Sequence, residues 1–166
     1  MTLTIVVRPP NAFTAEDKTA FKELVGKDKQ VNKETLPKLV EDAHLLAFLH
    51  IDNVLVGTHA IKNNPDYWTG LEEKAGVTLP AADYFGEVGY MHIAEAHRGA
   101  GLGKLLELAT IAAAKGRGLF CTIQSKNVSS RRLVESFGFK QVGKPWPSQE
   151  AEGKDVVNLY VRPGRG

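Results

Sequence analysis

Residues 97–104 read His97-Arg98-Gly99-Ala100-Gly101-Leu102-Gly103-Lys104, and this stretch decides how the 166-residue chain folds. A β-rich run, residues 87–93, comes before it, and the apolar residues of 102–113 recur after it at helical spacing. The predicted order is therefore strand, glycine loop, helix. The first N–H groups of a helix are unpaired and lie at the positive end of its dipole, and glycines let an anion approach the backbone closely. The segment predicts an anion-binding loop.

Two common phosphate-binding patterns do not fit this loop. The nucleotide P-loop needs a first glycine where Arg98 stands, and a Ser or Thr where Leu105 follows the lysine. The dinucleotide pattern Gly-x-Gly-x-x-Gly fails because Lys104 or Leu106 occupies the place of the third glycine. The pattern that does fit is Arg-x-x-Gly-x-Gly, at residues 98–103.

This pattern resembles the acyl-coenzyme A pyrophosphate loop of the GNAT (Gcn5-related N-acetyltransferase) superfamily. A second signature of that superfamily is an Asn that opens a helix ending in Gly-Phe, about one strand and one helix later. Here Asn127 follows a short apolar run at residues 119–123, and Gly138-Phe139 closes the next helix. The resemblance covers roughly residues 86–162 and, more loosely, the whole chain. Within the superfamily, the chain is most similar to poorly characterised bacterial members.

The resemblance implies an α/β (α+β) fold in a single domain, residues 1–166. The sheet is expected to be mixed, mostly antiparallel and six- to seven-stranded, with about four flanking helices and with strands 4 and 5 splayed apart. Sequence patterns place strands at residues 2–8, 45–51, 54–61, 87–93, 119–123 and 156–161, with one more after Gly138, and helices from 14 to 25, from 32 or 33 to 42, from 102 to 113 and from 127 to 137. Asp52-Asn53 suits a tight hairpin turn.

Residues 62–83 are polar and interrupted by prolines and glycines, so we expect a long loop with a short helix around residues 67–74. Its apolar side chains need a partner. They either line an acceptor pocket or pack on the domain's own surface or on a second subunit. Acceptor specificity is expected in this segment, in the first two helices and in residues 144–155.

Composition excludes several classes of protein. A formal charge of +2 is too small to indicate binding to nucleic acid or to a membrane surface. No apolar run is long enough to span a membrane, and the N-terminus lacks the pattern of a signal peptide, so we expect a cytoplasmic protein. Cys121 is the single cysteine, and its apolar surroundings favour a buried structural residue over a nucleophile.

The resemblance implies acetyl-CoA as cosubstrate and no metal. Its pyrophosphate would lie on the amides of the glycine loop, and its pantetheine arm would bond to the main chain of the preceding strand, with an Asn reaching it from the following helix. The cofactor-binding residues implied are Met91, His92, Ile93, Arg98, Gly99, Ala100, Gly101, Leu102, Gly103, Lys104 and Asn127.

Transfer to an amine needs a base, because an alkylammonium of pKa about 10.4 is not nucleophilic at pH 7. The resemblance to the Gcn5-type histone acetyltransferases assigns this role to Glu87, acting directly or through water. The alternative for Glu87 is a solvated residue at the start of a strand. His92 and His59 are the other candidate bases, and each also suits a structural strand residue.

One position departs from the superfamily. Many members carry a tyrosine seven residues after the Asn, where it protonates the departing thiolate, and here that residue is Val134. The hypothesis is therefore an N-acetyltransferase that moves an acetyl group from acetyl-CoA to a primary amine of a small molecule or protein by direct attack. The alternative is a catalytically weak coenzyme A-binding sensor or interaction module. The acceptor is not identified, and the sequence is compatible with a homodimer.

Overall fold

The computed structural model describes residues 1–29, 31–149 and 154–165. Those residues form seven strands, which are hydrogen-bonded in the order β1-β2-β3-β4-β5-β7-β6, and five α-helices. The elements are β1 (Leu3–Arg8), α1 (Ala15–Val25), α2 (Leu36–Asp42), β2 (Leu45–Ile51), β3 (Val54–Lys62), α3 (Pro65–Ala75), β4 (Tyr84–Ile93), α4 (Leu102–Ala113), β5 (Gly118–Gln124), α5 (Val128–Ser136), β6 (Lys140–Pro147) and β7 (Val156–Arg162), with short 3-10 helices at Pro10–Ala12 and Glu95–His97. The expected mixed sheet is confirmed.

The chain divides into two compact units. The first comprises Met1–Asn63 and Val88–Lys115, and the second comprises Asn64–Glu87 and Gly116–Gly166. β4 contributes residues to both, and the single-domain organisation stays a prediction. Within the described ranges, no helix combines the length and apolar character needed to cross a bilayer.

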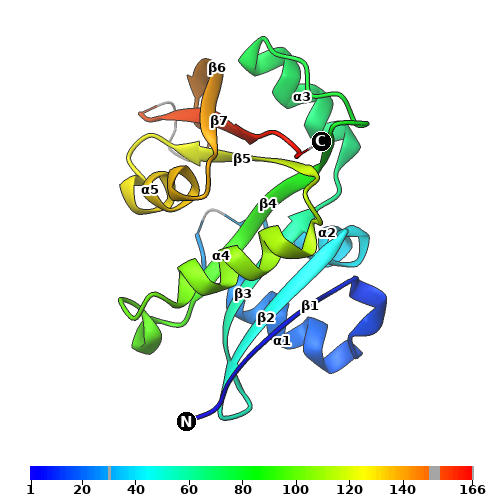
Figure 1. The fold of residues 1–166 in the computed structure, drawn as a ribbon, viewed down its shortest axis with the longest axis vertical. Helices are drawn as coiled ribbons and strands as arrows, with labels where there is room; N and C mark the ends of the chain where they lie inside the picture. The colour runs from blue at the N-terminus through cyan, green and yellow to red at the C-terminus, as the bar shows by residue number, and fades with distance from the viewer. Residues whose placement is uncertain (30, 150–153, 166) are drawn as a thin grey trace. The chain divides into compact units, whose positions relative to one another are not determined.

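The first unit is a sheet with helices on both faces (Figure 1). β2 pairs antiparallel with both β1 and β3. Because side chains alternate along a strand, Phe48 and Ala60 face α1 and α2, whereas Ala47 and Leu49 face α4. The sheet is thus covered by α1 and α2 on one face and by α4 on the other. α4 begins at the glycine loop.

Two local predictions in the first unit can be judged directly. The hairpin at Asp52 and Asn53 is confirmed, because both adopt left-handed backbone conformations with φ of 48° and 68°. α2 begins at Leu36, later than the predicted residue 32 or 33. The reason is Pro37, which has no N–H to donate and therefore belongs in the first turn of a helix.

The second unit is also built on a sheet. β4 pairs parallel with β5, and β7 lies antiparallel between β5 and β6. The registered β4–β5 pairs run from Tyr84↔Gly118 to Glu87↔Phe120, well before either strand ends.

The segment 62–83 is more regular than expected, because α3 spans 11 of its residues. The Asn64 side chain accepts a bond from Tyr67 N, and Pro65 occupies the first turn, so the helix start is well formed. Leu71 and Leu79 are buried in a core with Phe120. Leu71 and Leu79 therefore pack within their own unit. This agrees with the expectation that apolar side chains of the segment pack on the domain itself.

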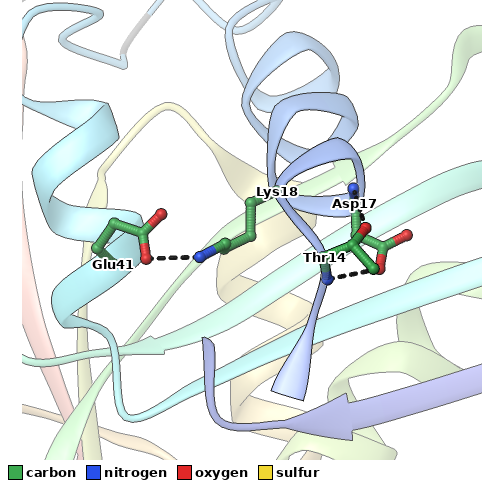
Figure 2. A network of polar contacts seen from close by, with 4 residues as sticks. All are labelled: Thr14, Asp17, Lys18 and Glu41. Atoms are coloured by element: carbon green, nitrogen blue, oxygen red, sulfur yellow. Dashed lines mark hydrogen bonds and ion pairs between the residues drawn. The ribbon is translucent and has the colours of Figure 1, made fainter. Parts of the chain in front are cut away.

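The start of α1 provides a test of local stability (Figure 2). Figure 2 shows the capping box, in which Asp17 N donates to Thr14 Oγ1 at 3.1 Å and Thr14 N donates to Asp17 Oδ2 at 3.0 Å. Thr14→Ala leaves the helix start unpaired and should lower the free energy of unfolding by about 1 kcal/mol, measured by urea denaturation. Thr19→Ala, at an exposed position inside the same helix, is the control and should not destabilise. Equal effects of both substitutions would contradict the capping role.

Candidate functional site

The glycine loop presents unpaired backbone donors at the start of α4. Gly99 and Gly101 adopt left-handed conformations with φ of 80° and 77°. Gly101 is the N-cap of α4 and has no side chain to accept a bond. The first hydrogen bonds of the helix run from Lys104 N and Leu105 N to Gly101 O. The N–H groups of Leu102 and Gly103, the first two helical residues, take no part in these bonds. These donors, together with the helix dipole, favour an anion at this point.

The two sides of the loop differ in the space they leave. A Cβ added at Gly99 or Gly101 would meet no atom within 4 Å, so the backbone there is open to a ligand. A Cβ on Gly103 would instead lie 3.9 Å from Ile93 Cγ1 and 4.0 Å from Met91 Sδ, against β4. The loop is therefore packed on one side and clear on the other, which fits a pyrophosphate group.

Arg98 connects the loop to the end of β4. Its Nε donates to Ile93 O at 2.8 Å, and the residue is exposed. This bond uses the Nε–H and orients the guanidinium group. The other N–H groups of Arg98 are separate donors that can bind an anion. Arg98 and Ile93, both implied as cofactor-binding residues, are thus joined by a hydrogen bond of their own.

β4 departs from extended geometry at Tyr90, which has φ of 57°. A left-handed conformation is rare for a bulky residue and usually marks a local constraint. Here Thr58 Oγ1 donates to Tyr90 O at 3.0 Å, and the Tyr90 ring packs edge-on against Phe21. Past this break, Met91 and Ile93 turn their side chains towards the core beneath α4.

Glu87 is buried. The strand begins at Tyr84, and only 5% of the Glu87 surface is exposed, so the alternative of a solvated strand-end residue is wrong. Thr122 Oγ1, on β5, donates to Glu87 Oε1 at 3.3 Å. A buried carboxylate held by a hydroxyl group is compatible with a general base, and that role stays a prediction.

The two histidine candidates differ in their surroundings. His59 is 2% exposed, and burial, with a smaller contribution from the Lys62 charge, lowers its pKa to about 3. A base so weak and so enclosed is poorly suited to take a proton from an acceptor. His92 is partly buried, and burial followed by the Arg98 charge lowers its pKa.

His59 faces a second buried ionisable residue that sequence analysis missed. Glu107 Oε2, on α4, lies 3.3 Å from His59 Nε2, and both side chains are 2% exposed. Burial raises the pKa of Glu107 to about 7. The sequence feature that could have revealed its burial is its position directly after the apolar Leu106, on the same helix face as Thr110, which is also buried.

Asn127 occupies the helix start that the sequence predicted. Its Oδ1 accepts bonds from Ser130 N and Ser129 Oγ, both at 3.2 Å, so it caps α5. Its role towards coenzyme A stays a prediction. Val134, where many family members carry tyrosine, is 5% exposed and belongs to the interior.

Cys121 is buried, as expected for a structural residue. Within the part of the chain that the structure describes, no group of three or more His, Cys, Asp or Glu side chains is placed to hold a metal ion. Of the predicted specificity segment 144–155, residues 150–153 lie outside the described residues.

Comparison with known proteins identifies the family. The sequence model described as "Acetyltransferase (GNAT) family" matches residues 11–139. The chain belongs to the GNAT acetyltransferase family. The match includes β4, the glycine loop, Asn127 and Gly138-Phe139, so the motifs quoted from the sequence lie within it. No curated protein matches the sequence significantly.

Solved GNAT structures share the fold at low sequence identity. An acyl-CoA N-acyltransferase from Pseudomonas aeruginosa is 14% identical, with 97% of this chain and 99% of that chain covered and a TM-score of 0.68. The ribosomal-protein-S18-alanine N-acetyltransferase from Escherichia coli is 15% identical, with coverages of 99% and 96% and a TM-score of 0.68. A GNAT acetyltransferase from Streptococcus pneumoniae is 17% identical, with coverages of 99% and 100% and a TM-score of 0.67. These likenesses establish the fold.

The buried Glu107 makes a prediction about pH and stability. Since its pKa is raised from 4.5 in the unfolded chain to about 7, the folded state binds the proton more tightly. The stability this contributes is complete below pH 4.5 and is lost as the pH rises through 7. Glu107→Gln removes that titration. Between pH 4.5 and 8, the free energy of unfolding of the wild type should therefore fall by about 3 kcal/mol relative to that of the variant.

Urea denaturation across this pH range measures the difference. Glu23→Gln, an exposed carboxylate on α1, is the matched control and should follow wild type at every pH. A constant difference between wild type and Glu107→Gln from pH 4.5 to 8 would show that Glu107 titrates normally.

Proposed function

We propose that this GNAT chain uses acetyl-CoA to acetylate a primary amine of a small molecule or protein. The observation that carries the proposal is the loop after β4, where two left-handed glycines leave open backbone in front of the helix start. This arrangement suits a pyrophosphate, because the amides and helix dipole attract an anion and no side chain obstructs it. Family membership supplies the acyl-transfer chemistry.

Each implied cofactor residue has a defined task. The amides of residues 99–104 would bind the pyrophosphate, and the Arg98 guanidinium group would add charge-assisted bonds to it. The main chain of Met91, His92 and Ile93 would hold the pantetheine arm. Asn127 is assigned to the same arm by family resemblance, in addition to capping α5.

An ammonium acceptor loses two protons in the reaction, and the first must leave before the nitrogen can attack. Converting an alkylammonium to the amine at pH 7 costs about 4.6 kcal/mol, so a positioned base accelerates the step. Glu87 would accept this proton directly or through water. The amine nitrogen then forms a bond to the acetyl carbon, the carbon–sulfur bond breaks, the thiolate leaves, and the nitrogen releases its second proton to solvent as the amide forms.

The leaving thiolate does not require a protein acid. With a thiol pKa near 8.5, departure without protonation at pH 7 forgoes only about 2 kcal/mol, and solvent supplies the proton afterwards. This agrees with Val134 at the position where many family members have tyrosine. Val134 also favours the second candidate, a coenzyme A-binding module with weak catalysis, and the two are separated by a turnover measurement.

Coenzyme binding is tested by thermal stability. Acetyl-CoA at about 100 times its dissociation constant should add roughly 2.7 kcal/mol to folding stability. Gly101→Val should abolish that increase, because its side chain fills the open space and strains a backbone with φ of 77°. Gly70→Val, on α3, also has no atom within 4 Å of its Cβ and should retain the increase. A folded Gly101→Val protein with an undiminished shift would place the coenzyme elsewhere.

The base is tested by turnover with a panel of amines, detecting free thiol. Glu87→Gln should lower kcat by about 100- to 10,000-fold at pH 7 while leaving acetyl-CoA affinity near wild type. The loss should shrink towards pH 9, where more amine is deprotonated without help. Thr122→Val removes only the hydroxyl bond to Glu87 and should cost less than about tenfold.

Two results would argue against this mechanism. Wild-type turnover by Glu87→Gln from pH 6 to 9 would transfer the role to His92 or water. Coenzyme binding by wild type without turnover on any amine, and without slow hydrolysis, would support the binding module.

A further inference from the structure

The Glu107–His59 pair has no part in the mechanism above. Both residues belong to the first unit, and only 2% of each side chain is exposed. The 3.3 Å contact between Glu107 Oε2 and His59 Nε2 uses one polar atom of each. Glu107 Oε1 and His59 Nδ1 are buried without a hydrogen-bond partner. Buried polar atoms without partners cost stability, so a purely structural contact would be better made by apolar side chains.

The surroundings of the pair are apolar. The side chains from β1 and β2 that face α4 include Ile5, Val7, Ala47 and Leu49. The charged or titratable residues of those strands, Arg8 and His50, alternate to the opposite face, where His50 stacks on Phe48.

Each of the two elements that hold the pair also carries one lysine. Lys62 of β3 reaches over the Tyr90 ring at 5.1 Å, and its charge acts on His59 from that side. Lys104 of α4 precedes Glu107 by one turn and is exposed. Glu107 and His59 therefore interact mainly with each other, in a medium of low polarity.

The pair lies close to the anion-binding loop along a single helix. Gly101 caps α4, and Glu107 follows within two turns, about 9 Å further along the helix axis. His59 belongs to β3, on which α4 packs. The contact therefore fixes the first half of α4, and with it the direction of the loop amides, against the sheet.

We propose that Glu107 is a positioning residue for the coenzyme, because one proton shared with His59 both holds the start of α4 on β3 and keeps negative charge away from the bound pyrophosphate. The inference rests on the proposed binding of acetyl-CoA at this loop.

The physical reason is the net charge of the pair. With one proton between them, Glu107 and His59 are neutral overall, whichever residue carries it. Loss of that proton leaves a buried negative charge on the helix whose start binds the pyrophosphate. Two like charges about 10 Å apart repel more strongly in the protein than in water, so binding and protonation reinforce each other.

The test compares acetyl-CoA affinity by calorimetry at pH 6.5 and 8.5. Glu107→Gln keeps a neutral hydrogen-bonding group of the same shape and cannot lose a proton. From pH 6.5 to pH 8.5, the ratio of wild-type affinity for acetyl-CoA to that of Glu107→Gln should fall about tenfold. Changes common to both proteins, from the coenzyme or other histidines, cancel in the comparison. Glu23→Gln on α1 should behave as wild type.

A second measurement is proton uptake on binding. At pH 7, heats of binding in buffers of different ionisation enthalpy should show more proton uptake by wild type than by Glu107→Gln. His59→Asn, which breaks the contact from the other side, should weaken acetyl-CoA binding at pH 6.5 relative to wild type. Raised KM for acetyl-CoA with little change in kcat is expected for His59→Asn.

Three outcomes would overturn the proposal. The first is an equal pH dependence for wild type and Glu107→Gln. The second is equal proton uptake by wild type and Glu107→Gln or, if Glu107→Gln does not fold, wild-type affinity of His59→Asn for acetyl-CoA at pH 6.5. The third is wild type that fails to bind acetyl-CoA even at pH 6.5, which rejects the proposed function as well, whereas the first two leave coenzyme binding intact.

Discussion

The left-handed backbone at Gly99 and Gly101 is the constraint on which the rest of the site depends. It reverses the chain between β4 and α4 and leaves the start of the helix without a side-chain cap. A residue with a Cβ would strain these conformations and would also fill the space in front of the amides. The same two glycines therefore form the turn and keep the backbone accessible to an anion.

The packing of α4 gives this turn its direction. Leu102 and Leu106 bury the helix against β2 and β3, and Gly103 lies beside Met91 and Ile93. A rigid helix start is what an anion site needs, because donors that are already oriented lose little entropy on binding. The buried Glu107–His59 contact stands out within this apolar packing, since it makes the stability of the helix position depend on a proton.

Local patterns predicted much of the fold correctly. The helix after the loop, the hairpin at Asp52 and Asn53, and the helix start at Asn127 all depend on nearby residues, whose conformational preferences are written in the sequence. The helix predicted at residues 67–74 already included Gly70, and α3 is longer because it begins at Pro65, which fits the first turn after the Asn64 cap. The start of α2 was placed too early for a similar reason, since the helix begins only where Pro37 can occupy its first turn.

The sequence by itself determined the order of the elements and predicted an anion-binding loop at residues 98–104, because both inferences follow from spacing and from glycine chemistry. Tertiary structure alone decided that Glu87 is buried beside Thr122 and that His59 meets Glu107 inside the first unit. These contacts join residues far apart in the chain, and their chemistry depends on the exclusion of water. Burial and the identity of a distant partner are properties of the packed fold, and neither can be read from local sequence.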